Sequence, residues 1–264
     1  MKKSFQLSVL GPRGSMATCR RDCALFGGDS SCYMVRAGDE TIFLDAGSGL
    51  VAAPARYPKP PVILLSHLHL DHVIGLGMFP GFGEAGQRAR VYLPFCEDAA
   101  EATGLMARVY SPPFWPVELG RLKGEPEILP LPPVLRIGEV LAESMEGNHP
   151  NRAAVIRLRF DGRSIVYATD YETEESSFTR LCEFAKDADL VLFDAQFTEE
   201  ESRCRRGFGH STAQAGIELM RRSGAKRLLL IHHAPTSTDE VLLEREQELA
   251  EGVSYAREGE CISL

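Results

Sequence analysis

Short apolar segments separated by glycine and proline fill the first two thirds of the chain and limit the folds that it can adopt. Their content of Val, Ile, Leu, Phe and Tyr is typical of β-strands. In chain order they are FQLSVLG, SCYMVRAG, TIFLDAG, PVILLSH, RVYLP, AAVIRLRFDG and SIVYATD. Two later segments, ADLVLFDA and AKRLLLIHHAP, are apolar on both faces, which is typical of central strands. The Asp161-Gly162 pair between two of the segments predicts a hairpin turn.

Amphipathic helical patterns lie between and after these strands. In EESSFTRLCEFAKDA the apolar face is formed by Phe178, Leu181, Cys182 and Ala185. In HSTAQAGIELMRRSG, Ser211 followed three residues later by Gln214 predicts a capping box, and Gly224 predicts the end of the helix. DEVLLEREQELAE predicts a charged helix near the C-terminus. The order of elements predicts an α/β fold in which helices flank mixed sheets, as one domain over residues 1–264.

Composition excludes several classes of protein. The 264 residues are 44% hydrophobic and 25% charged, which allows a substantial core. No segment approaches the roughly 18 apolar residues that span a bilayer, and the start lacks the apolar stretch of a secretory signal. We therefore expect a cytoplasmic protein. The net charge of −8 disfavours a long nucleic acid as partner, because such binding depends on Lys and Arg neutralising phosphates.

The seven cysteines are an odd number in a chain without an export signal, which predicts reduced thiols. Cys19 and Cys23 have a spacing that can hold a metal, but no second pair matches it, so buried or incidental thiols are favoured.

A proline-dense segment over residues 110–133 resists assignment to a central strand or a long helix. A connector is one interpretation. The other is a lid that presents Tyr110, Phe114 or Trp115 to a ligand.

Three of the chain's seven histidines and one aspartate crowd into residues 67–72, directly after the apolar run PVILL. His67 and His69 are two residues apart in an extended segment, so their side chains point the same way. Asp71 and His72 follow the bend and can face a second centre. Imidazole with carboxylate suits zinc, manganese or iron better than calcium. Solvated histidines are the alternative, but imidazoles crowded in one loop would repel each other on protonation.

Further ligands are available at the ends of other strands. His149 lies in EGNHPN, Asp170 ends SIVYATD, and His232 ends RLLLIHH. Strand ends and loops are where binding sites are built, so these side chains are expected to complete a site around residues 67–72.

At this point the sequence resembles a known family. SHLHLDH is similar to the HxHxDH signature of the metallo-β-lactamase superfamily, and the later elements resemble its phosphodiesterase branch, near RNase Z and the phosphoribosyl cyclic phosphodiesterases. The resembling segments also include GPRGSMA, FGGDSSCYMV, FLDAGSGL, NHP, VYATD, LVLFDAQFTEEE, GHSTAQA and LLLIHHAP. The resemblance implies a four-layer αββα sandwich with the site at one edge, between the sheets.

The resemblance also implies a dinuclear metal site of zinc or manganese, with iron as a further option. Its first metal would bind His67, His69 and His149, its second would bind Asp71, His72 and His232, and Asp170 would bridge them. His233 would then be a neighbour or a substrate contact. Asp45 looks like the carboxylate that orients a metal-binding imidazole, with a plain turn aspartate as the alternative.

The catalytic set implied by the resemblance is His210, Asp194 and Asp71. A hydroxide shared by two metals would attack phosphorus. His210 would act as general acid, with Asp194 holding its proton.

Departures from the family pattern bear on the substrate. Leu70 stands where many relatives have tryptophan, and the long arm with which RNase Z grips transfer RNA is absent, which favours a small phosphodiester such as a cyclic nucleotide. GPRGS and FGGDSS are rich in glycine and hydroxyl groups and would suit phosphate contacts, or serve only as turns. A thioester or lactone hydrolase and a non-catalytic metal sensor are the alternatives. A homodimer is the commonest soluble assembly and is left open.

Overall fold

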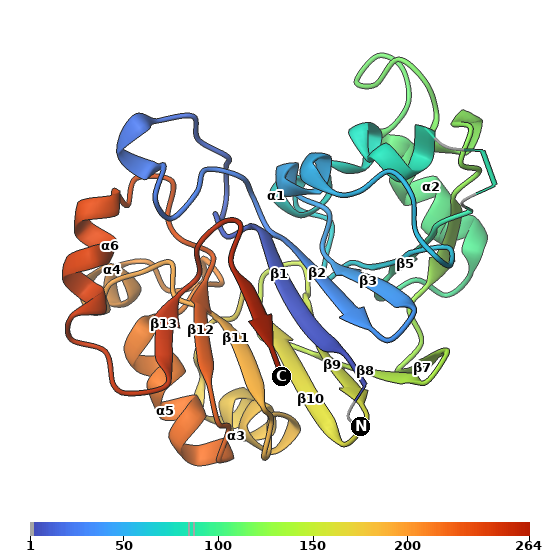
Figure 1. Ribbon diagram of the computed structural model, residues 1–264. Coiled ribbons are helices and arrows are strands. Elements are labelled where there is room, and N and C mark those ends of the chain that lie inside the picture. The colour runs from blue at the N-terminus through green and yellow to red at the C-terminus, as the bar shows by residue number, and fades with distance from the viewer. Residues whose placement is uncertain (1–2, 84, 87) are drawn as a thin grey trace.

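The computed structural model describes residues 3–83, 85–86 and 88–264, which form two seven-stranded sheets (Figure 1). The first sheet has the order β14 (Cys261–Ser263), β1 (Phe5–Gly11), β2 (Cys32–Ala37), β3 (Glu40–Leu44), β4 (Val62–Leu64), β5 (Arg90–Leu93) and β6 (Glu127–Pro130). The second has the order β13 (Val253–Tyr255), β12 (Leu228–Ile231), β11 (Leu190–Asp194), β10 (Arg163–Ala168), β9 (Ala154–Phe160), β8 (Val140–Glu146) and β7 (Val134–Ile137). Each sheet is mixed, with antiparallel pairs on one side and parallel pairs on the other.

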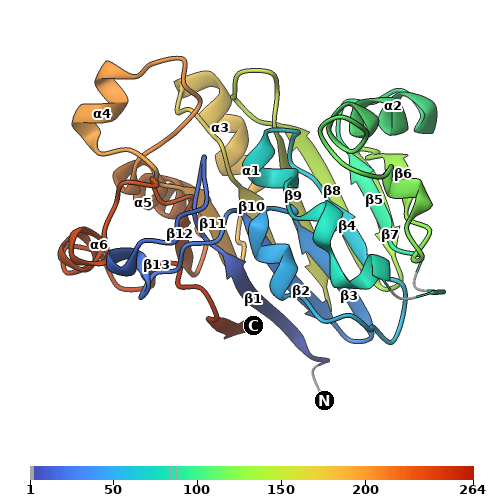
Figure 2. The ribbon, with the colours of Figure 1, turned by 90° about the horizontal axis from the view of Figure 1, so that it is seen from above.

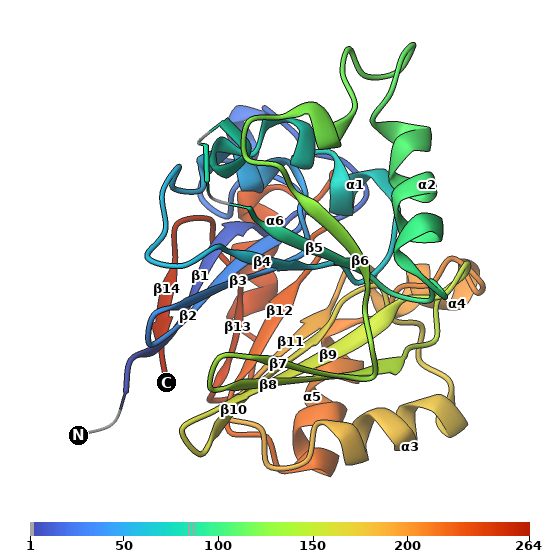
Figure 3. The same ribbon diagram turned by 90° about the vertical axis from the view of Figure 1, so that its right-hand side faces the viewer.

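Helices cover the outer face of each sheet. Figures 2 and 3 show α1 and α2 on the first sheet and α3 and α5 on the second. The α-helices are α1 (Leu70–Val73), α2 (Ala99–Val109), α3 (Glu175–Phe184), α4 (Glu199–Cys204), α5 (Ala213–Ser223) and α6 (Asp239–Glu246). The order helix, sheet, sheet, helix is the αββα sandwich that the sequence predicted. Within the described ranges, no helix has the length and apolarity needed to cross a membrane.

The core lies in three layers, and the central strands contribute to two of them. Leu192 of β11 packs between the sheets, whereas its neighbour Phe193 packs under the outer helices. In the first sheet Leu64 faces inward and Ile63 faces outward. Burial on both faces explains why these strands read as continuous apolar runs.

Two local predictions are confirmed. The predicted apolar face of α3 and its C-cap is buried, as a 3.6-residue period requires: Phe178, Leu181, Cys182 and Ala185. Asp161 and Gly162 join β9 to β10 with φ of 50° and 74°, the left-handed pair that a two-residue hairpin needs.

The predicted capping box at Ser211 is wrong. Thr212 is the N-cap of α5, and its hydroxyl accepts a hydrogen bond from the backbone N–H of Ala215. The hydroxyl of Ser211 is instead 2.6 Å from that of Thr173. Gly224 ends the helix as predicted, with φ of 70°.

The proline-dense segment is a connector in the structure that contains one short 3-10 helix, Leu119–Arg121, and the edge strand β6. Tyr110 is buried and its hydroxyl donates to the carbonyl of Val73, while Trp115 packs against Tyr110 with ring centroids 5.3 Å apart. Neither aromatic ring is free to act as a lid. Phe114 is 79% exposed.

Candidate metal centre

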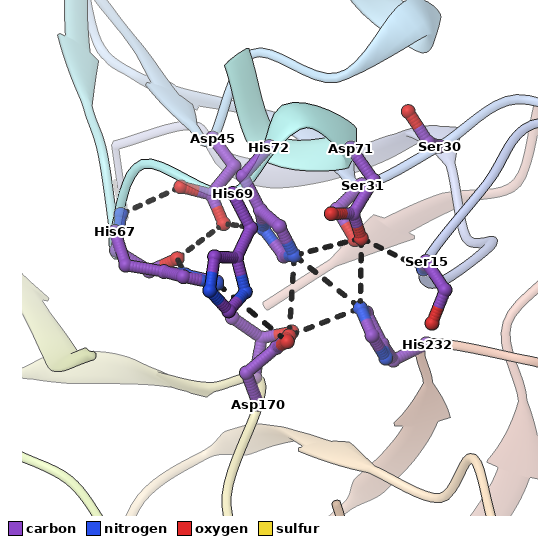
Figure 4. A network of polar contacts seen from close by, with 12 residues as sticks. Ser15, Ser30, Ser31, Asp45, His67, His69, Asp71, His72, Asp170 and His232 are labelled. Atoms are coloured by element: carbon purple, nitrogen blue, oxygen red, sulfur yellow. Dashed lines mark hydrogen bonds and ion pairs between the residues drawn. The ribbon is translucent and has the colours of Figure 1, made fainter. Parts of the chain in front are cut away.

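The loop after β4 brings the first three imidazoles together. His69 is extended and α1 begins at the next residue, and the ring centroids of His67 and His69 lie 4.4 Å apart on one side (Figure 4). The ring centroid of His149, from the loop after β8, lies 4.9 Å from that of His67 and 5.0 Å from that of His69. The sequence-based prediction that the i and i+2 imidazoles share a side is confirmed.

Three clusters of donor atoms form at this edge of the sheets. Within the described residues, one group contains His67, His69, His149 and Asp170 and another contains Asp71, His72 and His232, each with ligand atoms within 4.8 Å of one another. A third contains Asp170, Asp194, His210 and His232. Neither Cys19 nor Cys23 belongs to these groups.

Asp170 lies between the first two clusters. Its Oδ1 is 3.2 Å from Nε2 of His72 and 3.0 Å from Nε2 of His232. Its Oδ2 is 3.7 Å from Nε2 of His67 and 3.8 Å from Nε2 of His149. The two oxygens of one carboxylate therefore face different clusters.

Backbone strain marks the strand ends that supply the site. Asp45, Asp170 and His232 follow β3, β10 and β12 and have φ of 59°, 47° and 62°. A left-handed conformation costs a non-glycine residue on the order of 1 kcal/mol and is concentrated at functional sites. Here it turns each side chain out of the sheet toward the clusters (Figure 4).

A buried carboxylate orients one of the imidazoles. Asp45 accepts hydrogen bonds from the Ser66 backbone N–H at 2.6 Å, the Ser66 hydroxyl at 2.7 Å and the Tyr167 hydroxyl at 2.6 Å. Its Oδ2 also lies 2.6 Å from Nδ1 of His72. With the proton on Nδ1, the Nε2 of His72 presents its lone pair to the second cluster. The predicted place of Asp45 behind a histidine matches this geometry.

The imidazoles of the first cluster are suited to bind a cation. Burial lowers the pKa of His67 well below its usual value, with the neighbouring His72 adding to the effect, and burial also lowers the pKa of His69 and His149. Nε2 of His67 is buried and has no hydrogen-bond partner among the residues that the structure describes. Neutral imidazoles with an unused nitrogen are the form that metals bind.

The second cluster fits a cation for the opposite reason. Burial disfavours protonated His72 and His232, but the carboxylates of Asp170 and Asp71 outweigh burial and raise both pKa values, that of His232 to about 10. Burial raises the pKa of Asp170, but the neighbouring His232 and His72 outweigh burial and hold this pKa well below its usual range. Without a metal, protons on the two imidazoles balance the negative charge of the carboxylates. A divalent cation would replace these protons and balance the same charge, so the donor set fits metal binding.

His232 and His233 face in different directions. His232 joins the clusters, whereas Nε2 of His233 donates to the carbonyl of Ala256 at 2.8 Å and its ring packs on Phe26 and Tyr255. Burial lowers the pKa of His233 to about 3. His233 is therefore a core residue and not a substrate contact.

His210 and Asp194 form a pair beside the clusters. Nδ1 of His210 lies 2.8 Å from Oδ2 of the fully buried Asp194. The backbone N–H of Tyr171 also donates to this oxygen, and that of Gln196 donates to Oδ1. The His210 ring stacks on His232 with centroids 5.0 Å apart. Because Nδ1 is engaged by the carboxylate, Nε2 is the nitrogen left for proton transfer.

Backbone N–H groups of the GPRGS and FGGDSS loops donate to protein carboxylates. The backbone N–H of Ser15 donates to Oδ2 of Asp71 at 2.7 Å. A Cβ at Gly14 would lie 2.2 Å from Nδ1 of His232, so only glycine allows this approach. In the second loop, the backbone N–H groups of Gly28 and Asp29 donate to Glu258. The first loop thus supports candidate ligands, a role that the sequence did not reveal.

Glu172 is a second residue that sequence reasoning missed. Its carboxylate accepts the backbone N–H of Gly207 at 2.8 Å and that of Gly209 at 2.9 Å. The carbonyl of Gly209 in turn lies 2.9 Å from Nδ1 of His149. Glu172 therefore holds the loop that orients His149 and leads directly to His210.

Replacing Glu172 by alanine is expected to lower kcat/KM about 10-fold, because the freed loop no longer fixes the His149 ring. Glu172→Gln, which keeps one acceptor oxygen, should lose less. The exposed Glu251 offers a matched control, since Glu251→Ala removes the same charge elsewhere. Equal activity of Glu172→Ala and Glu251→Ala would show that the loop needs no such support.

Known proteins resemble this chain in both sequence and fold. Residues 40–233 match the model of the beta-lactamase superfamily domain. Ribonuclease Z of Haloferax volcanii is 24% identical over 97% of this chain and 93% of its own length. The crystal structure of the metallo-beta-lactamase fold protein YhfI from Bacillus subtilis superposes with a TM-score of 0.76 at 20% identity, covering 100% of both chains. A diphosphatase of the PhnP family gives a TM-score of 0.75 at 17% identity, covering 100% of this chain and 98% of its own.

These findings agree with the family predicted from SHLHLDH, and the ribonuclease Z match supports its phosphodiesterase branch. The names of the relatives, together with the histidine and aspartate clusters, support a metal-dependent hydrolase. With well over half of its length matched by the family model, the chain belongs to the beta-lactamase superfamily.

Proposed function

We propose that this protein is a dinuclear metal-dependent phosphodiesterase that hydrolyses a small phosphodiester. The observation that carries the proposal is the His210–Asp194 pair beside the first two donor clusters, between which Asp170 lies. Phosphodiester hydrolysis needs charge neutralisation at the phosphoryl oxygens and a proton for the departing oxygen. The clusters supply the first need and the pair supplies the second.

The clusters would divide the ligands between two cations. The first set would be His67, His69 and His149, the second set would be Asp71, His72 and His232, and Asp170 places one oxygen near each set. Two divalent cations held there would polarise the phosphoryl oxygens and lower the pKa of a water molecule. Zinc and manganese suit this mixture of imidazole and carboxylate, and iron is a further option.

His210 delivers the proton. Its Nδ1–H donates to Asp194, which orients the ring, and the proton on its Nε2 passes to the departing oxygen as the oxygen of water bonds to phosphorus and the bond to the departing oxygen breaks. Asp71 is fixed by the Ser15 backbone N–H and contributes its charge to the second cluster. The residues thus separate charge neutralisation from proton donation.

The small size of the substrate is supported by charge. Ribonuclease Z, by its name, acts on RNA, but the net charge of −8 here opposes binding of a long phosphate backbone. A cyclic nucleotide or another small diester avoids that repulsion. A cytoplasmic location and a homodimer stay predictions.

Purified protein loaded with zinc or with manganese should hydrolyse bis-p-nitrophenyl phosphate and at least one member of a cyclic nucleotide panel. A thioester and a precursor transfer RNA assayed in parallel separate the alternatives. Turnover of the thioester alone would replace the proposal with an acyl hydrolase, and turnover of the RNA alone would overturn the small substrate. Metal binding without turnover of any substrate would favour a sensor.

A further inference from the structure

A cavity of about 370 Å³ opens beside the histidine loop, and His67 and His69 form part of its wall. Pro94, Phe95 and Leu105 line it with apolar surface. His67 and His69 of the first cluster line the cavity, whereas the ring of His210 lies beside His149 and His232, with centroids 5.8 and 5.0 Å away. A substrate whose departing oxygen faces His210 can place the group retained on phosphorus on the His67 and His69 side, where this cavity opens.

One wall of the cavity is a flat, stacked pair. The guanidinium carbon of Arg152 lies 4.0 Å from the centroid of the Phe95 ring. Nε and Nη2 of Arg152 also donate to the two carboxylate oxygens of Glu146 at 3.0 and 2.8 Å. Because Glu146 balances the arginine's charge, the pair offers a planar surface and little net attraction for a second phosphate.

The backbone around this wall is held in an uncommon conformation. Phe95, Asn151 and Arg152 all line the cavity and have φ of 61°, 62° and 68°. Left-handed non-glycine residues are sparse in proteins, and they gather where a ligand must be clamped. Three at one cavity next to the donor clusters indicate a surface shaped for binding.

We infer that this cavity is a subsite for a planar aromatic group retained on the phosphorus of the substrate, either a nucleobase or an aryl ring. The inference rests on the proposed phosphodiesterase function. Phe95 and Arg152 provide the flat surface, Pro94 and Leu105 exclude water from it, and Asn151 adds an amide that can pair with the edge of a base. The cavity thereby favours an aromatic diester over an aliphatic one.

Two esters with the same p-nitrophenolate leaving group test this subsite: thymidine 5′-p-nitrophenyl phosphate and methyl p-nitrophenyl phosphate. Stacking of a base on an aromatic side chain should give the thymidine ester a kcat/KM about 10-fold higher, mainly through KM. Replacing that ester by bis-p-nitrophenyl phosphate distinguishes an aryl ring from a nucleobase. Phe95→Ala, and Phe95→Leu with its better retained packing, should both bring the preference to within about twofold.

Phe114→Ala is the matched control, since Phe114 is an exposed phenylalanine that does not line the cavity. It should keep the wild-type preference. Absence of any preference for either aromatic ester in the wild type, or its survival in both Phe95 variants, would overturn the subsite.

Calorimetric titration with thymidine 5′-monophosphate and with methyl phosphate separates this inference from the proposed function. The nucleotide should bind about 10-fold tighter to wild-type protein, and this difference should disappear in Phe95→Leu. Equal binding of the two would overturn the subsite whatever the activity. Failure to hydrolyse any ester, combined with tighter nucleotide binding, would overturn the phosphodiesterase and leave the subsite supported.

Discussion

Alanine in place of His210 should lower kcat by about 10²- to 10⁴-fold while the protein keeps its metal. The imidazole touches Asp194 through Nδ1 and stacks on His232, so its loss removes the proton donor but none of the seven proposed ligands. Metal content by plasma mass spectrometry and steady-state kinetics on one preparation measure both quantities.

The leaving group provides the internal control for His210. An alkoxide needs protonation as it departs, whereas p-nitrophenolate leaves without it, so His210→Ala should affect an alkyl diester more than an aryl diester. Asp194→Asn should show the same pattern more weakly, because the amide still contacts His210 but cannot stabilise its charge. Metal loss in His210→Ala would instead identify His210 as a ligand, as its place in the third donor group allows.

Asparagine in place of Asp170 should have the largest effect and lower both metal content and activity to near background. Oδ1 of Asp170 faces His72 and His232, and Oδ2 faces His67 and His149, so one substitution removes negative charge from both clusters. The amide nitrogen cannot act as a metal ligand at the second position. Metal affinity and activity typically fall 10- to 100-fold when a residue that hydrogen-bonds to a metal ligand is replaced. Loss of a carboxylate shared by both clusters should lower them further.

Asp161→Asn is the matched control for this variant. Asp161 is an exposed hairpin residue, and asparagine tolerates its φ of 50°. Circular dichroism of both variants checks that Asp170→Asn still folds. Two metals per chain in folded Asp170→Asn would contradict the shared position of this carboxylate.

Patterns local in sequence were sufficient for much of the fold and the site. The apolar period of α3, the turn at Asp161-Gly162 and the two-sided burial of β11 all follow from neighbouring residues. His67 and His69 could be placed together because an extended backbone fixes the direction of alternate side chains.

Other features depended on contacts between segments distant in sequence. Glu172 reaches Gly207 and Gly209, and Ser15 reaches Asp71, 56 residues away. Nothing in the neighbourhood of Glu172 or Ser15 signals such partners, because backbone N–H groups are present at almost every position. The capping error has the same origin, since the hydroxyl of Ser211 contacts the distant Thr173 while the adjacent Thr212 caps α5.

The sequence by itself determined the layered α/β fold, the histidine loop and the set of residues available as ligands. Tertiary structure decided how they meet: which of His232 and His233 faces the clusters, how the oxygens of Asp170 are shared, and what supports His149. The physical reason is that apolar periodicity is a property of each segment, whereas the direction of a side chain at a strand end depends on left-handed backbone turns and hydrogen bonds that form only when the two sheets pack.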